Sequence, residues 1–301
     1  MDFRLVLLLL CILHTTKSYD EIETQLHKFW KHSGAQLDTS NTCLLKSMSF
    51  DNEKAEDAFL HGFCEGIPNN YHSGVSLPRR KATAILAKAA LVLPIMGDFC
   101  ETGLNKGTSA TIMMRMLMQY DKCGRKFWGF DSFTGLPPNV TSADGVWGIA
   151  FKEGDMAEAQ STFEANLKSW EAWDEPRMVI TKGYFSDTLP TSKIDKISFL
   201  RLDGDIFVST WDALEYLYHK VVPGGYIYVD DYGSFEGCRE AVDKFRAKHQ
   251  IWEPIHFIRE ENQIRYIMFE AVWWKKRERH EGEAAAAPTA AAATTKRLRA
   301  M

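Results

Sequence analysis

The chain has 301 residues, of which 45% are hydrophobic and 25% are charged, and its formal net charge at pH 7 is −4. This length suits one large domain with extensions or two small domains, and the apolar content is sufficient for a folded core. The acidic balance gives no reason to expect nucleic acid as a partner. The six cysteines include no CxxC or Cys/His spacing that would suit zinc.

An apolar run from Leu5 to Leu13 follows Arg4 and precedes small and polar residues. The run is shorter than the roughly 20 residues that span a bilayer, and the pattern is typical of a secretory signal peptide. We therefore expect a signal peptide at residues 1–18, no stable membrane span, and a protein of the secretory pathway. The alternatives are a buried N-terminal helix and a cytoplasmic protein.

Residues 19–76 are mixed and partly amphipathic, which predicts a helical N-terminal extension. Alanines and leucines at helical spacing then run from Leu77 to Leu93, with Pro78 at the start and Pro94 just past the end. This pattern predicts a helix that leads into the main domain, which we expect at residues 77–274.

A glycine-containing loop comes next, between a short apolar strand predicted at residues 98–102 and a methionine-rich helix. Gly103 and Gly107 allow the backbone to approach a ligand closely. The start of the helix, at Thr108 and Ser109, offers free N–H groups. The order of strand, glycine loop and helix is shared by nucleotide sites and S-adenosylmethionine sites. The G-x-x-x-G spacing differs from the G-x-G-x-x-G of dinucleotide enzymes, which disfavours an oxidoreductase.

The second predicted strand, Lys126 to Asp131, ends in an acid. Asp131 lies where related sheets hold the ribose of an adenosine cofactor. The same residue also fits the N-cap of a turn through Ser132 and Phe133, and both interpretations stay open. The long Gly- and Pro-rich segment of residues 132–155 predicts a lid over the substrate, with Trp147 and Phe151 as contacts.

The remaining elements alternate strand and helix, which predicts a parallel, doubly wound α/β sheet. The predicted elements are a helix within 156–173, a strand at 177–182, a loop at 183–190, a strand from Ile197 to Asp203, a helix at about 209–220, a turn at Pro223-Gly224-Gly225, a strand ending at Asp230, a helix at 236–249, and a hairpin within 252–274 broken at Glu260-Glu261-Asn262.

Two of these strands end in pairs of acids, Asp203 with Asp205 and Asp230 with Asp231. If the strands are parallel neighbours, their carboxyl ends meet at one edge of the sheet, where ligands of such sheets bind. Four carboxylates gathered there repel one another unless a cation intervenes. The sequence therefore predicts a hard divalent cation, although each acid pair by itself also fits a simple turn.

Five motifs now occur in a fixed order: GDFCETGLNKGTSA, GFDSFTGLPP, KGYFSDTLP, LRLDGDIFVST and PGGYIYVDDYGSFEGCREAVDKF. Together they resemble the macrocin O-methyltransferase family of S-adenosylmethionine-dependent sugar methyltransferases over residues 97–274. The resemblance implies a class I methyltransferase fold, which is Rossmann-like and doubly wound, with seven strands of which the last is antiparallel.

The resemblance also implies the cofactors S-adenosyl-L-methionine and Mg²⁺ and a role for each matching residue. Asp203, Asp230 and Asp231 match the metal ligands, and Asp205 matches the general base. The cofactor-binding positions are Glu101, Thr102, Gly103, Gly107, Thr108, Ser109, Asp131 and Ser132.

The expected reaction is methyl transfer to a hydroxyl of a small sugar, glycoside or glycan acceptor chelated to Mg²⁺. Two alternatives stay open, namely an inactive methyltransferase-like binding protein and another nucleotide-cofactor enzyme such as an oxidoreductase. A homo-oligomer is also left open. Residues 275–301 form a low-complexity, Ala-rich tail that we expect to be disordered.

Overall fold

The computed structural model describes residues 64, 66–67, 75–92, 95–138, 140–141, 144–145, 150–259 and 269–277. The predicted signal peptide, most of the N-terminal extension and the tail beyond residue 277 lie outside these ranges. Trp147 and the predicted break at residues 260–262 also lie outside them. Within the described ranges, no helix is long and apolar enough to cross a membrane.

The described helices and strands follow one another along the chain as predicted for an α/β protein. They are α4 (Leu77–Val92), β1 (Asp98–Thr102), α5 (Thr108–Tyr120), β2 (Phe127–Asp131), α6 (Gln160–Ser169), β3 (Met178–Lys182), α7 (Phe185–Thr188), β4 (Ile197–Leu202), α8 (Phe207–Leu217), β5 (Val221–Val229), α9 (Glu236–Lys248), β6 (His256–Arg259) and β7 (Phe269–Lys275). Short 3₁₀ helices lie at Glu175–Arg177, Leu189–Thr191 and Tyr218–Lys220.

The strands form one seven-stranded sheet in the order β3-β2-β1-β4-β5-β7-β6. The first five strands of the chain pair in parallel, whereas β7 is antiparallel to both of its neighbours, β5 and β6. This confirms the predicted doubly wound sheet with an antiparallel last strand. It also brings the carboxyl ends of β1, β4 and β5 to the same edge of the sheet.

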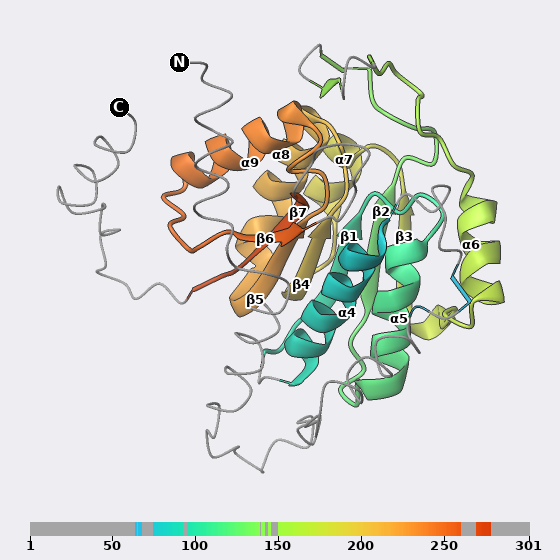
Figure 1. The fold of residues 1–301 in the computed structure, drawn as a ribbon. Helices are drawn as coiled ribbons and strands as arrows, with labels where there is room; N and C mark the ends of the chain where they lie inside the picture. The colour runs from blue at the N-terminus through green and yellow to red at the C-terminus, as the bar shows by residue number, and fades with distance from the viewer. Residues whose placement is uncertain are drawn as a thin grey trace.

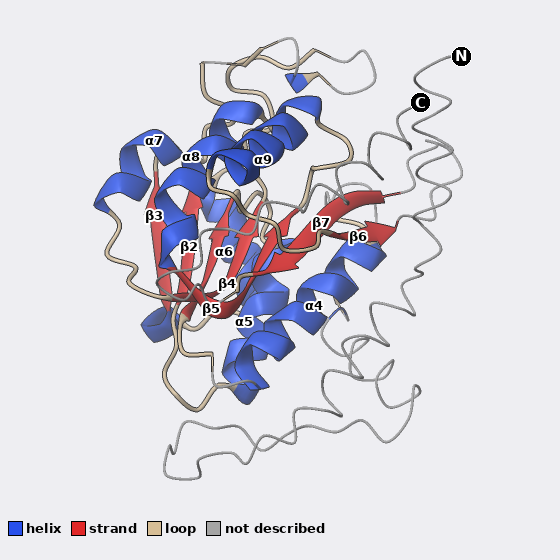
Figure 2. Cartoon of the chain, turned by 90° about the vertical axis from the view of Figure 1, so that its left-hand side faces the viewer, coloured by secondary structure: helices blue, strands red, loops and turns tan. Residues whose placement is uncertain are grey.

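Helices cover both faces of the sheet, as Figures 1 and 2 show. Buried apolar side chains of α4, α5 and α6 pack in one cluster on one face, and those of α8 and α9 pack in a second cluster on the other. The central strand β4 is buried on both sides, since all six of its residues are buried. A strand with two covered faces is expected to read as a continuous apolar run, as β4 does apart from Ser198 and Arg201.

One predicted turn is wrong. Pro223-Gly224-Gly225 lies inside β5, in an irregular stretch where the register with β4 shifts from Ile197 opposite Val221 to Phe199 opposite Tyr226. Two steps along β4 therefore correspond to five along β5. The residues typical of a turn absorb this extra length as a bulge instead of ending the strand.

The long segment after β2, residues 132–155, has backbone hydrogen bonds between its two ends and contacts the rest of the domain. Leu136 N donates to Asp155 O at 2.9 Å, and Gly154 N donates to Leu136 O at 3.0 Å. Asp144 is fully buried, and its Oδ1 accepts a 2.7 Å hydrogen bond from the N–H of Phe207, the first residue of α8. The ring of Phe151 lies 5.5 Å from that of Phe235. The described parts of the predicted lid therefore pack beside the carboxyl edge of the sheet.

Candidate active site

A cavity of about 440 Å³ opens at the carboxyl edge of the central strands. Its wall combines residues of the loops after β1, β2, β4 and β5 with Arg79 of α4 and Glu270 of β7. Pro137 and Pro138 from the predicted lid, together with Met156 just after it, complete one side. The fold therefore brings segments from most of the domain to one binding site.

The predicted cofactor residues divide into two groups. Five of them line the cavity: Gly103, Thr108, Ser109, Asp131 and Ser132. The other three, Glu101, Thr102 and Gly107, are buried behind its wall. Their predicted role in cofactor binding stays a prediction, and in the structure they support the residues that face the cavity.

Asp131 fulfils the turn role that the sequence left open. Its Oδ1 accepts a hydrogen bond from Phe133 N at 2.7 Å, which closes the turn after β2. Its Oδ2 accepts hydrogen bonds from Leu104 N at 2.7 Å and Asn105 N at 3.1 Å, which ties the glycine loop to β2. Because Asp131 also lines the cavity, the ribose contact stays a prediction beside this structural role.

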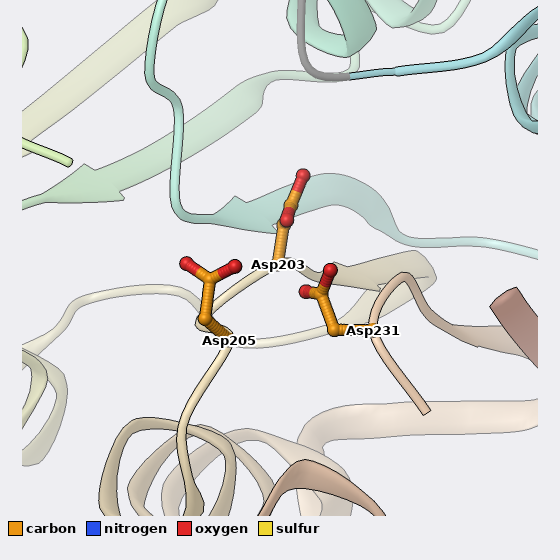
Figure 3. A group of neighbouring side chains, drawn as sticks. All are labelled: Asp203, Asp205 and Asp231. Carbon is orange, nitrogen blue, oxygen red and sulfur yellow. The ribbon is translucent and has the colours of Figure 1, made fainter. Parts of the chain in front are cut away.

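Three acids gather at the ends of β4 and β5, as Figure 3 shows. Asp203, Asp205 and Asp231 each offer one carboxylate oxygen, and these oxygens all lie within 4.8 Å of one another. We call these three residues the acid cluster. Asp205 has φ 59°, a left-handed conformation that few non-glycine residues adopt, although Asp is among those that tolerate it.

Asp230, the fourth predicted acid, has different partners. Its Oδ1 accepts hydrogen bonds from Arg201 Nη2 at 2.5 Å and from the hydroxyl of Tyr228 at 2.9 Å. Its Oδ2 forms an ion pair with Nη1 of Arg79. In the structure, then, Asp205 lies with Asp203 and Asp231, whereas Asp230 lies between two guanidinium groups.

The acid cluster fits a divalent cation. Burial raises the pKa of Asp203, Asp205 and Asp231, and the neighbouring carboxylates raise each pKa further. Within the described part of the chain, Oδ2 of Asp231 is buried and has no hydrogen-bond partner. Carboxylate oxygens are the ligands that Mg²⁺ prefers, and a cation would relieve both the repulsion and the missing bond.

The cavity also fits an amino-acid-bearing cofactor beside the glycine loop. No side chain caps the N-terminus of α5, which begins at the cavity after Gly107 with φ 87°. A helix N-terminus without a capping side chain binds carboxylate groups well. The loop itself can come close to a ligand because Gly103 has no side chain.

Four functional candidates were missed in the sequence: Arg79, Arg201, Tyr228 and Glu270. Arg79 binds Glu270 through Nη2 at 3.3 Å as well as Asp230, and both Arg79 and Glu270 line the cavity. Arg201 interrupts the apolar strand β4, and a charge at such a position requires buried partners. That signal was present in the sequence. No such signal in the sequence marks Arg79 or Glu270, because only the fold brings α4 and β7 to this edge.

Part of the free energy of unfolding is expected to depend on the protonation of Glu101. Measured in the presence of a metal chelator, this part should decrease as the pH rises from about 4.5 to about 7. Burial raises the pKa of Glu101 from its usual value of 4.5 to about 7, against the opposing effect of Arg201. The folded state therefore binds the proton more tightly, so this stabilisation is complete below pH 4.5 and lost above pH 7.

Urea unfolding at several pH values measures this effect as the difference between the wild type and Glu101→Gln. The glutamine variant should lose stability less steeply over this window because it has no proton to release. Parallel curves for the two proteins would contradict the expectation.

Residues 9–276 match the family Macrocin-O-methyltransferase (TylF). Demethyldecarbamoylnovobiocin O-methyltransferase of Streptomyces niveus is 34% identical over 191 residues, which is 62% of this chain and 72% of that protein. The 8-demethyl-8-(2,3-dimethoxy-alpha-L-rhamnosyl)-tetracenomycin-C 4'-O-methyltransferase of Streptomyces olivaceus is 30% identical over 214 residues, 70% of this chain and 80% of that protein.

Solved structures show the same fold. The O-methyltransferase NovP superposes with a TM-score of 0.61 at 30% identity, covering 74% of this chain and 88% of that chain. The calicheamicin methyltransferase CalS11 gives a TM-score of 0.53 at 19% identity, covering 76% of this chain and 94% of that one, which supports the fold alone.

The sheet order, the antiparallel β7 and the glycine loop at the cavity define a class I methyltransferase. Since the family match spans most of the sequence, the chain belongs to the macrocin O-methyltransferase family. The protein is an O-methyltransferase enzyme, which confirms the expected class and disfavours the binding-protein and oxidoreductase alternatives.

Proposed function

We propose that the protein transfers the methyl group of S-adenosyl-L-methionine to a hydroxyl of a sugar or glycoside with the help of Mg²⁺. The observation that carries this proposal is the acid cluster in the same cavity as the glycine loop. A single cavity can hold a methyl donor and a hydroxyl side by side, and such alignment supplies much of the rate of a two-substrate reaction.

The cofactor would lie along the loop after β1. Gly103, Ser109 and the start of α5 are suited to its amino-acid part, and Asp131 to its ribose. When bound, the cofactor supplies an electrophilic methyl group on a sulfonium centre. The chain has only to orient this group and to keep water from the reacting atoms.

Asp203, Asp230 and Asp231 are the proposed metal ligands, as the family resemblance implies. Asp203 and Asp231 already face a common space (Figure 3). Because Asp230 binds Arg79 and Arg201 in the structure, its coordination of a cation requires the exchange of one of these bonds. Bound Mg²⁺ supplies a Lewis acid that lowers the pKa of an acceptor hydroxyl.

Asp205 is the proposed acceptor of the hydroxyl proton. Burial and the nearby carboxylate of Asp203 raise its pKa well above the usual aspartate value. A general base works best when its pKa lies near the working pH, so the raised pKa favours this role. The left-handed backbone of Asp205 places its side chain beside Asp203.

The acceptor class is proposed from the relatives. The Streptomyces olivaceus relative is named for methylation of a rhamnosyl-bearing compound. The proposed acceptor of this chain is likewise a sugar hydroxyl, and the aromatic residues Tyr184, Phe185 and Phe235 in the cavity wall offer surfaces for a sugar ring.

Isothermal titration with S-adenosylmethionine, with and without MgCl₂, tests the proposal. We expect the cofactor to bind in both conditions. We also expect labelled methyl groups to reach a neutral glycoside only when MgCl₂ is present. Absence of cofactor binding would sink the proposed function, and equal turnover in chelator would exclude the metal role.

A further inference from the structure

Arg201 is a fully buried cation in the centre of the sheet. Its side chain has no exposed area, although it belongs to the apolar strand β4. Nη1 donates to Oε1 of Glu101 at 2.9 Å and to Oδ2 of Asp203 at 2.5 Å, and Nη2 donates to Oδ1 of Asp230 at 2.5 Å. One guanidinium group therefore binds three carboxylates from three adjacent strand ends.

The strand register holds Arg201 in place from both sides. Glu101 of β1 lies opposite Arg201, and Tyr228 of β5 lies opposite it on the other side. The guanidinium carbon of Arg201 lies 5.0 Å from the ring centroid of Tyr228. The Tyr228 hydroxyl donates to the same Asp230 oxygen that Arg201 binds. This arrangement leaves the guanidinium group little freedom to move.

Each of the three carboxylates leads to a different part of the cavity wall. Glu101 accepts a hydrogen bond from the hydroxyl of Ser109, which lines the cavity at the start of α5. Asp203 belongs to the acid cluster. Asp230 continues to Arg79. Arg201 therefore contacts the metal side of the cavity directly at Asp203 and reaches the cofactor side at Ser109 through Glu101.

We propose that Arg201 is a positioning residue that holds the cofactor wall and the acid cluster in one arrangement. This inference rests on the proposed function. Among the described residues, the cavity lining does not include Arg201, so it acts through Glu101 and Asp203 and not by touching the reactants. Its pairing also offsets repulsion among the acids that surround it.

Lysine is the informative replacement for Arg201. A guanidinium group is a planar fork that can bind several carboxylates at once, whereas an ammonium group is a compact point charge. Arg201→Lys keeps the positive charge and removes the fork. A change in this variant therefore reports geometry and not the loss of charge.

The test measures two dissociation constants by isothermal titration, that of S-adenosylhomocysteine and that of MgCl₂. In Arg201→Lys, the Kd of Mg²⁺ is expected to rise about tenfold or more, as for other partners of metal ligands. The Kd of S-adenosylhomocysteine is expected to rise about fivefold or more through the loss of the Glu101 contact. Ser109→Ala should weaken only S-adenosylhomocysteine.

Arg125→Lys is the matched control. Arg125 is also buried and ion-paired, with Asp121, but it lies before β2 at the opposite end of the strands. This variant should lower the melting temperature and leave both dissociation constants unchanged. If Arg201→Lys does not fold, Glu101→Gln provides the same test. Glu101 shares Nη1 of Arg201 with Asp203, so weakening this contact should raise the Kd of Mg²⁺ about threefold or more.

An Arg201→Lys protein that is destabilised like the control but keeps either affinity would overturn the inference. An unchanged Kd of Mg²⁺ in Glu101→Gln would do the same. If the wild-type protein binds no S-adenosylhomocysteine at all, both the inference and the proposed function fail. If the wild type binds it and only the variants behave unexpectedly, the inference alone fails.

Discussion

Asparagine in place of Asp205 is expected to lower kcat for methyl transfer by about 10²- to 10⁴-fold, the usual contribution of a general base. The substitution preserves the size of the side chain and removes its basic oxygen, so the hydroxyl proton has no acceptor. Asp203 and Asp231 remain, and the dissociation constants of Mg²⁺ and S-adenosylhomocysteine should therefore stay within about twofold of the wild type.

This split between rate and affinity distinguishes two roles that the structure offers to Asp205. Its carboxylate oxygen lies within 4.8 Å of those of Asp203 and Asp231, a separation that also suits a third metal ligand. If Asp205 is a ligand, Asp205→Asn should weaken Mg²⁺ as strongly as Asp203→Asn does. That result would contradict the general-base role and would identify Asp205 as a metal ligand.

Rates with a labelled cofactor and saturating MgCl₂ give kcat, and titration of the same samples gives the two affinities. Asp187→Asn is the matched control, because Asp187 is an exposed acid of the short helix α7 that does not line the cavity. It should leave kcat and both affinities unchanged. An equal loss of kcat in both variants would show that the effect is not specific to the acid cluster.

The sheet edge could be predicted from sequence because its physical causes are local. The run DFCET forms β1 at the predicted residues 98–102, since it is short and followed by glycine. Once the strands are taken as parallel, their ends must meet, and Asp203 and Asp231 do so. The chemistry of the site follows from strand order and not from any single motif.

Contacts between distant segments could not be predicted in the same way. Asp230 and Asp231 are adjacent in sequence, yet Asp231 joins the acid cluster while Asp230 binds Arg79 and Arg201. Successive side chains at the end of a strand point in different directions, so residues adjacent in sequence need not contact the same protein groups. The partner of Asp230 on α4 depends on how that helix packs across the sheet.

Pro223-Gly224-Gly225 shows the opposite limitation. Its composition is typical of a turn, but β4 pairs with β5 both before it, at Val221, and after it, from Tyr226, where β7 pairs with β5 as well. Gly225 has no room for a side chain, since an added Cβ would lie 2.9 Å from the carbonyl oxygen of Val222. Tertiary pairing therefore keeps within a strand a sequence that favours a turn by itself.

Alanine in place of Gly103 is expected to destabilise the protein by several kcal/mol and to abolish cofactor binding. Gly103 has φ +85°, and a Cβ atom there would lie 1.7 Å from the carbonyl oxygen of Asp203 and 2.7 Å from its carbonyl carbon. Both clashes involve backbone, so no side-chain rotation relieves them. The left-handed backbone alone costs alanine about 1–2 kcal/mol, and the clash adds to it.

Gly124→Ala separates the two causes. Gly124 has a similar φ of +73°, but an added Cβ would meet nothing within 4 Å. Urea unfolding should give a loss of about 1–2 kcal/mol for this control and a distinctly larger loss for Gly103→Ala. Titration with S-adenosylhomocysteine should show normal binding only in the control.

Equal destabilisation of the two alanine variants would mean that backbone conformation, and not contact with Asp203, requires glycine at position 103. A larger loss for Gly103→Ala would show that the close approach of the Asp203 backbone requires glycine at position 103. Gly103 N donates to Phe130 O at 2.9 Å, and Asp203 N donates to Thr102 O at 2.8 Å. These hydrogen bonds hold the loop after β1 and the backbone of Asp203 at the same edge of the sheet. A side chain at Gly103 must therefore displace the cofactor loop and the acid cluster together.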